Sequence, residues 1–211
     1  MSSYFLIYFL LNFLMIFFCT KISYKLKLVD LPNKRKVHSQ PTAFTGGITI
    51  SLILLFTLQL LDMFDKSLGL ILSLSFLISL VGLIDDKFSL NTGGKLSLQI
   101  LPIFYLIIFE NLILKDIGDY YYFKLELGSF AVPFTLLSVL FLINSFNYFD
   151  GLDGTLSYTT LTVLAILFFL IEDQNLDLFL LIIIIPICVF LFFNLFFIKL
   201  FNDIFLYKNI L

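Results

Sequence analysis

The chain has 211 residues, of which 60% are hydrophobic and 13% are charged, and its formal net charge is −2. The charged share is about half that of an ordinary soluble domain, so the composition excludes a typical soluble protein and indicates an integral membrane protein. The slightly acidic balance argues against nucleic acid as a partner. Cys19 and Cys188 lie in apolar stretches, where we expect small hydrophobic side chains rather than a disulfide or a zinc site.

Apolar stretches long enough to cross a bilayer, about 17–25 residues, recur along the chain. We expect seven spans, at residues 4–20, 46–62, 67–84, 96–114, 131–149, 155–171 and 177–198. No positive charge precedes the first stretch and no small-residue cleavage site follows it, so we expect a retained span and no signal peptide. The predicted fold is an all-α polytopic membrane helix bundle that forms a single domain over residues 1–211.

The basic residues predict the orientation of the bundle, because cytoplasmic loops carry an excess of Lys and Arg. Ten basic residues belong to the loops and flanking helix ends on one side: Lys21, Lys25, Lys27, Lys34, Arg35, Lys36, Lys87, Lys95, Lys199 and Lys208. Three belong to the other side: Lys66, Lys115 and Lys124. We therefore expect the N-terminus outside, the polar motifs on cytoplasmic loops, and the protein in the inner (plasma) membrane.

The predicted outer loop, residues 115–130, is rich in tyrosine and alternates between apolar and polar residues. This pattern predicts either a short β-hairpin or a belt of aromatic side chains at the membrane interface. We assign it no chemistry.

Residues 144–154 concentrate amides, carboxylates and glycines between two apolar stretches. Asn144, Asn147 and Asp150 recur every third residue, which would place them on one broad face of a helix. Gly151 and Gly154 would then let the backbone approach a ligand closely. Polar groups at membrane depth indicate function by default. The alternative is an ordinary turn, because turns are also rich in Asn, Asp and Gly.

Two adjacent carboxylates, Asp85 and Asp86, close the third predicted span. They repel each other and lie near the negative end of the helix dipole, and Asp150 has the same position at the end of the fifth span. A shared divalent cation would offset the negative charge of all three carboxylates. Mg²⁺ fits best, with Mn²⁺ as a second candidate. The alternative is that Lys87 and Lys95 neutralise the pair.

The first cytoplasmic loop holds a basic run, Lys34, Arg35 and Lys36, followed by His38. Such a run suits phosphate groups of a lipid or a nucleotide. For the basic run taken alone, simple anchoring on the cytoplasmic side is the favoured alternative, and a lone histidine is more often structural than catalytic. A divalent cation, basic residues and a site open to lipid together predict phosphoryl transfer to a lipid phosphate.

These motifs, in this order, resemble those of the polyprenyl-phosphate N-acetylhexosamine-1-phosphate transferases, also called glycosyltransferase family 4. Residues 30–38 match the Asp-x-Pro-Asn-x-Arg-Lys-x-His loop of its N-acetylglucosamine branch, and residues 144–154 match its Asn-x-x-Asn-x-x-Asp-Gly-x-Asp-Gly motif. Its Asp-Asp motif with downstream Lys and Gln is matched by Asp85, Asp86, Lys95 and Gln99.

The resemblance implies transfer of N-acetylhexosamine 1-phosphate from a UDP-sugar to undecaprenyl phosphate, with release of UMP, as the first membrane step of a cell-envelope polysaccharide such as lipopolysaccharide. It implies catalytic roles for Asp85, Asp86 and Asp150, and metal binding by Asp85, Asp86, Asp150 and Asp203. The residues implied to bind substrate are Asn144, Asn147, Asp153, Lys95, Arg35, Lys36 and His38.

The match fails toward the C-terminus. Around Asp203 the family's Gly-Asp-x-Gly-Ser motif is only partly present, its later His-x-His-His loop is absent, and the family has more spans. We therefore expect a domain that is incomplete at its C-terminus. It is either an active transferase, whose site a homodimer or another chain completes, or an inactive protein that binds only lipid phosphate or a partner chain. An ion-coupled transporter is a third reading, but it predicts carboxylates near the middle of a span.

Overall fold

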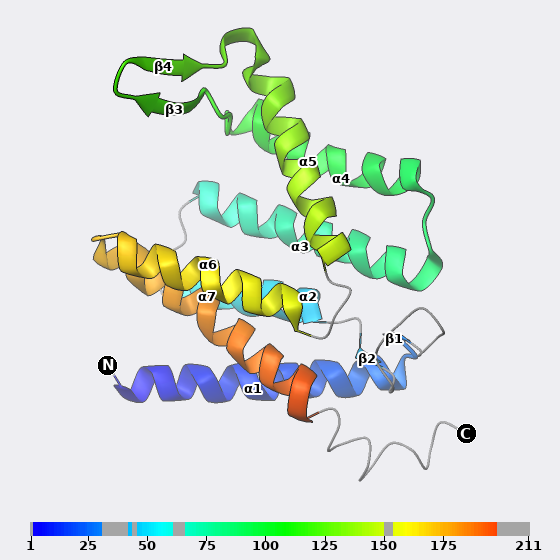
Figure 1. The fold of residues 1–211 in the computed structure, drawn as a ribbon. Helices are drawn as coiled ribbons and strands as arrows, with labels where there is room; N and C mark the ends of the chain where they lie inside the picture. The colour runs from blue at the N-terminus through cyan, green and yellow to red at the C-terminus, as the bar shows by residue number, and fades with distance from the viewer. Residues whose placement is uncertain (1, 31–41, 44–45, 61–65, 150–153, 198–211) are drawn as a thin grey trace. The chain divides into compact units, whose positions relative to one another are not determined.

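The computed structural model confirms an all-α bundle with helices at each of the predicted positions (Figure 1). It describes residues 2–30, 42–43, 46–60, 66–149 and 154–197. The helices in these ranges are α1 (Ser2–Lys25), α2 (Gly46–Leu60), α3 (Lys66–Phe88), α4 (Thr92–Phe109), α5 (Ala131–Phe149), α6 (Thr155–Leu170) and α7 (Gln174–Phe192). A π-helical segment, Phe193–Phe197, follows α7.

Five of the described helices are long and apolar enough to cross a membrane, two fewer than the sequence predicts. The shorter ones are α2 and α6, with 15 and 16 residues. At about 1.5 Å per residue a helix of this length reaches about 24 Å, less than the roughly 30 Å of a hydrocarbon core. Helix α6 ends at Leu170, because Ile171 is extended and the charged residues Glu172 and Asp173 follow it.

The fourth helix is displaced from its predicted bounds of residues 96–114. It begins at Thr92, because the side chain of Asn91 caps it by accepting a hydrogen bond from the Gly94 N–H at 2.7 Å. It ends at Phe109, and Asn111 then adopts a left-handed backbone with φ of 53°. Hydropathy alone misses both ends, because a cap acts through hydrogen bonds and not through apolarity.

The outer loop forms the predicted β-hairpin, made of β3 (Asp116–Tyr120) and β4 (Phe123–Glu126) in antiparallel register. A 3₁₀ turn, Gly128–Phe130, leads from it into α5. A second antiparallel pair joins β1 (Val29–Asp30) to β2 (Thr42–Ala43).

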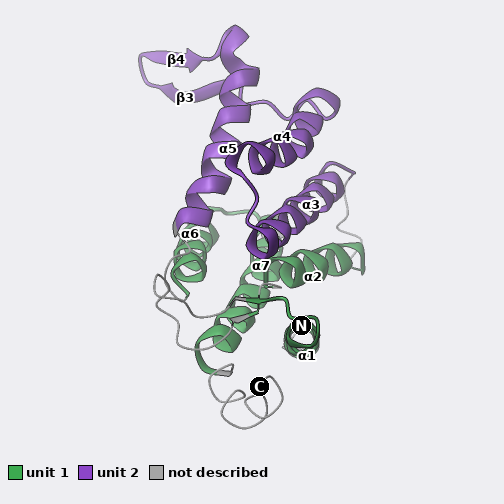
Figure 2. Ribbon diagram, turned by 90° about the vertical axis from the view of Figure 1, so that its right-hand side faces the viewer, with its two compact units in different colours: residues 1–63, 149–211 green, residues 64–148 purple. Residues whose placement is uncertain are grey.

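The chain divides into two compact units (Figure 2). Unit 1 comprises residues 1–63 and 149–211, and unit 2 comprises residues 64–148. The expectation of one domain over the whole chain stays a prediction.

The core of unit 1 forms where α1, α2 and α7 pack together, with Ile16, Ile53, Val189 and Phe193 at its centre. The Tyr8 hydroxyl donates a hydrogen bond to the Ile182 carbonyl oxygen at 2.9 Å, which ties α1 to α7. Gly46 opens α2, and a Cβ atom there would overlap the ring of Phe190. Unit 1 therefore depends on close helix approach, as membrane bundles commonly do.

Unit 2 contains α3, α4, α5 and the hairpin. Its core is built on Ile103 and Ile107 from α4 and Leu140 from α5, with Ile78 of α3 packed against them. The Lys66 ammonium lies 3.7 Å from the Glu110 carboxylate, so the start of α3 and the end of α4 meet at one end of the unit. The polar motifs of α3, α4 and α5 meet at the other end.

Candidate functional site

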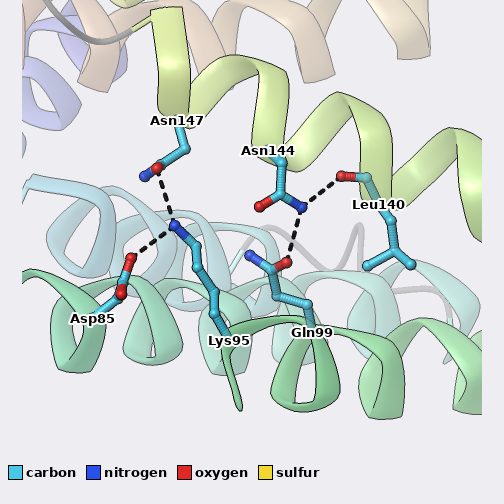
Figure 3. A network of polar contacts seen from close by, with 6 residues as sticks. All are labelled: Asp85, Lys95, Gln99, Leu140, Asn144 and Asn147. Carbon is cyan, nitrogen blue, oxygen red and sulfur yellow. Dashed lines mark hydrogen bonds and ion pairs between the residues drawn. The ribbon is translucent and has the colours of Figure 1, made fainter. Parts of the chain in front are cut away.

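Lys95 joins three helices of unit 2 at their polar ends. Its Nζ atom lies 2.7 Å from Oδ2 of Asp85, in the last turn of α3. The same atom donates a hydrogen bond to Oδ1 of Asn147, in the last turn of α5, at 3.0 Å (Figure 3). Lys95 itself lies in the first turn of α4. Two motifs that are far apart in the sequence, carried on three helices, therefore meet at one ammonium group.

A short turn between α3 and α4 produces this juxtaposition. Ser89 leaves α3 in a left-handed conformation with φ of 51°, and Asn91 caps the next helix two residues later. The chain thereby reverses within a few residues, which brings the last turn of α3 beside the first turn of α4. Asp85 and Lys95, ten positions apart, become neighbours.

The ion pair is largely removed from solvent, since the side chains of Lys95 and Asp85 are 15% and 18% exposed. Asp85 lies near the negative end of the α3 dipole, and the positive end of α4 and the Lys95 charge offset that position. Lys95 thus pairs with Asp85, which is one of the contacts that the lysine alternative predicts. The Nζ atom of Lys87 lies 5.4 Å from the centre of the Phe88 ring. The neighbouring carboxylate, Asp86, is exposed.

A second polar contact joins α4 to α5 deeper in unit 2. The Asn144 amide nitrogen donates to Oε1 of Gln99 at 3.0 Å and to the Leu140 carbonyl oxygen at 2.8 Å (Figure 3). Gln99 is only 3% exposed. Sequence reasoning noted Gln99 as part of a motif but gave it no role. Its position one helical turn after Lys95, within an apolar stretch, is the signal that it faces the same neighbour.

Two layers of contact thus hold α4 against α5. We name Lys95–Asn147 the outer contact, because Asn147 is exposed, and Gln99–Asn144 the inner contact, because Gln99 is buried. The partners are four residues apart on α4 and three apart on α5, which is the spacing of one helical turn.

The structure therefore brings together four of the predicted site residues, Asp85, Lys95, Asn144 and Asn147, with Asp86 next in sequence. The other predicted residues lie outside the described ranges: Arg35, Lys36, His38, Asp150, Asp153 and Asp203. Within the described part of the chain, no group of three or more His, Cys, Asp or Glu side chains lies close enough to hold a metal ion. The predicted metal set stays a prediction.

Membrane-length helices whose ends bring a carboxylate, an amide and a lysine together define an integral membrane protein with a polar site at its helix ends. The chain belongs to glycosyl transferase family 4, whose family model matches residues 68–203. The matched segment contains most of α3 and all of α4 and α5, and so every residue of the outer and inner contacts.

Curated relatives carry a more specific name. The chain is 32% identical over 149 residues to the undecaprenyl-phosphate alpha-N-acetylglucosaminyl 1-phosphate transferase of Escherichia coli O157:H7, covering 70% of this chain and 41% of that protein. It is 30% identical over 157 residues to the Yersinia pestis transferase of the same name, covering 74% and 43%. The probable undecaprenyl-phosphate N-acetylglucosaminyl 1-phosphate transferase of Bacillus subtilis is 28% identical over 152 residues, covering 70% and 42%. The chain thus matches about two fifths of the length of these relatives.

Proposed function

We propose that this chain transfers N-acetylglucosamine 1-phosphate from UDP-N-acetylglucosamine to undecaprenyl phosphate and releases UMP. The observation that carries the proposal is the convergence of Asp85, Lys95 and Asn147 at one end of unit 2. The names of the relatives support the sugar phosphate and the lipid acceptor.

In the proposed reaction an oxygen of the lipid phosphate attacks the β-phosphorus of the sugar nucleotide. The bond between that phosphorus and the bridging oxygen breaks, and UMP leaves with the electron pair. Lys95 binds the phosphate oxygens and offsets their charge. Its contacts with Asp85 and Asn147 hold the ammonium group in place before substrate arrives, so little side-chain entropy is lost on binding.

Magnesium is the proposed cofactor, with manganese as the second candidate. The donor chemistry fits, because Mg²⁺ is commonly held by one or two carboxylates together with substrate phosphates and water. Asp85 and Asp86 would supply carboxylates, and Asp150 and Asp203 complete the predicted set. When bound, the ion stabilises negative charge on the phosphate oxygens.

The remaining assignments follow the family motifs. Asn144, Asn147 and Asp153 would position the nucleotide, and Arg35, Lys36 and His38 would bind phosphate. Asp85 or Asp86 would act as the general base that receives a proton from the lipid phosphate. We propose that this site faces the cytoplasm at the inner membrane, and that a second copy of the chain contributes where the site needs further residues.

The position of the carboxylates favours transfer over ion-coupled transport. Asp85 and Asp86 lie in the last turn of α3, three and two residues before its final residue, Phe88. A soluble nucleotide reaches a site at a helix end, and a lipid phosphate has its charged group at the same level. Coupling ions in transporters instead bind near the bilayer midplane.

The test is UMP release by the purified chain in detergent with UDP-N-acetylglucosamine, undecaprenyl phosphate and Mg²⁺. We expect turnover that falls by about 100-fold in Asp86→Asn, the loss typical of removing one electrostatic stabiliser. Asp119→Asn, the same change on the exposed hairpin, is the matched control and keeps full activity. Equal rates in the two variants, or no UMP from a folded preparation, would contradict the proposal.

A further inference from the structure

The β3–β4 hairpin of unit 2 has two chemically different faces. Cross-strand partners share a face, and the register pairs Tyr120 with Phe123, and Asp119 with Lys124. Gly118 pairs with Leu125 on the face of the first pair. One face of the hairpin is therefore aromatic and apolar, and the other is charged.

The aromatic face is built as an ordered surface. The rings of Tyr120 and Phe123 stack with their centres 5.2 Å apart and their planes at 29°. Both side chains nevertheless stay more than half exposed. Gly118 permits the arrangement, because a Cβ atom there would lie 3.3 Å from the Tyr120 ring. At the turn, Tyr121 and Tyr122 are 95% and 90% exposed.

Ion pairs order the opposite face. The Lys124 ammonium lies 3.1 Å from the Asp116 carboxylate and 3.8 Å from that of Glu126. The hydrogen bond to Asp116 raises the pKa of Lys124 above its ordinary value. This face is suited to water, whereas the aromatic face exposes large apolar rings that water solvates poorly.

Short connections hold the hairpin at the level of the helix ends. The Leu114 N–H donates to Oγ1 of Thr135 in the first turns of α5 at 2.9 Å, and the Leu127 N–H donates to the Lys115 carbonyl oxygen at 2.9 Å. Figure 1 shows the hairpin beside the start of α5. Exposed aromatic side chains also mark the helix ends next to it, Phe109 on α4 and Phe130 before α5.

We propose that this hairpin lies along the phospholipid interface, with its aromatic face and tyrosine turn among the headgroups and its charged face toward water. Tyrosine suits that environment, because its ring is apolar and its hydroxyl bonds to water or headgroups. The proposal commits to lipid because the hairpin emerges directly from membrane-length helices, so a bilayer is already within reach of the rings. The hairpin then anchors the depth of α4 and α5 in the bilayer.

The chain contains no tryptophan, so one introduced tryptophan reports on one site. The matched variants are Tyr120→Trp, on the aromatic face, and Asp119→Trp, next in sequence on the charged face. Each full chain is reconstituted into vesicles of phosphatidylcholine and phosphatidylglycerol whose acyl chains are brominated near the headgroup. We expect bromine to quench Tyr120→Trp at least about threefold more than Asp119→Trp, and aqueous iodide to quench in the reverse order.

A third variant, Tyr122→Trp, changes only the turn. It tests the proposal independently of the stacked pair, which the substitution at Tyr120 alters. Blue-shifted emission and bromine quenching at Tyr122→Trp support the proposal even if the substitution at Tyr120 disturbs the hairpin. Full iodide quenching without bromine quenching at both aromatic positions would overturn it, and would leave the face open to water or to a protein partner. The readout does not depend on transferase activity, so it stands or fails apart from the proposed function.

Discussion

The outer and inner contacts both join α4 to α5 through polar side chains, but they differ in charge and in exposure to solvent. The outer contact places a charged ammonium against the exposed amide of Asn147 and the carboxylate of Asp85. The inner contact pairs two neutral amides, and its Gln99 is buried. An ammonium that contacts an exposed amide can change partners when a ligand arrives, whereas an amide contact to a buried Gln99 is costly to open. We therefore propose that the outer contact serves substrate binding and that the inner contact positions it.

The largest effect is expected at the outer contact. Lys95→Met removes the ammonium that joins three helices and leaves Asp85 without that partner. We expect UMP release to fall by about 100-fold or more, the scale seen when a single electrostatic group is lost. Lys124→Met, the same change on the hairpin, is the control. A Lys95→Met enzyme as active as this control would show that the outer contact is structural only.

The inner contact is expected to affect stability first. Gln99→Leu leaves the partly buried Asn144 amide with only the Leu140 carbonyl oxygen as an acceptor, so the free energy of unfolding should fall by about 1 kcal/mol. SDS titration followed by circular dichroism measures this. We expect a smaller loss of activity than for Lys95→Met, about tenfold, and mainly in KM, because Asn144 loses its orientation. An unchanged unfolding midpoint would refute the positioning role.

A double substitution sharpens the distinction between packing and positioning. Gln99→Leu combined with Asn144→Leu replaces both partners by apolar groups, which is often nearly neutral for stability. We expect the unfolding midpoint to return toward that of the unchanged chain while activity stays low. Recovery of both stability and activity would mean that Asn144 does not contact substrate.

The smallest effect is expected at the exposed ion pair of Lys124 and Asp116, which is the solvent-exposed counterpart of Lys95 and Asp85. Because the pKa of Lys124 is raised in the folded chain, its pair contributes fully below the ordinary lysine pKa. That contribution is lost as the pH rises through the raised value. Thermal unfolding should show this alkaline loss in the unchanged chain and not in Asp116→Asn, and equal profiles would contradict the assignment.

Sequence patterns predicted much of this fold because each pattern is local. Apolar stretches located every described helix, and the tyrosine-rich alternation of residues 115–130 gave the hairpin as one of two options. Helix α4 begins earlier than predicted, because the Asn91 cap acts through a hydrogen bond that hydropathy does not register. The end of α6 differs from its predicted bound by one residue for a related reason, since Ile171 is apolar but already extended.

The sequence by itself determined the membrane class, the helix order and the family motifs, because these depend on composition and on spacing along the chain. Only the tertiary structure decided that Lys95 binds Asp85 and Asn147, and that Gln99 pairs with Asn144. From the sequence, either a shared cation or Lys87 and Lys95 could neutralise Asp85 and Asp86. The short turn at Ser89 and Asn91 brings Lys95 to Asp85, because it sets the first turn of α4 beside the last turn of α3. Which charges make contact depends on that geometry, which spacing along the sequence does not determine.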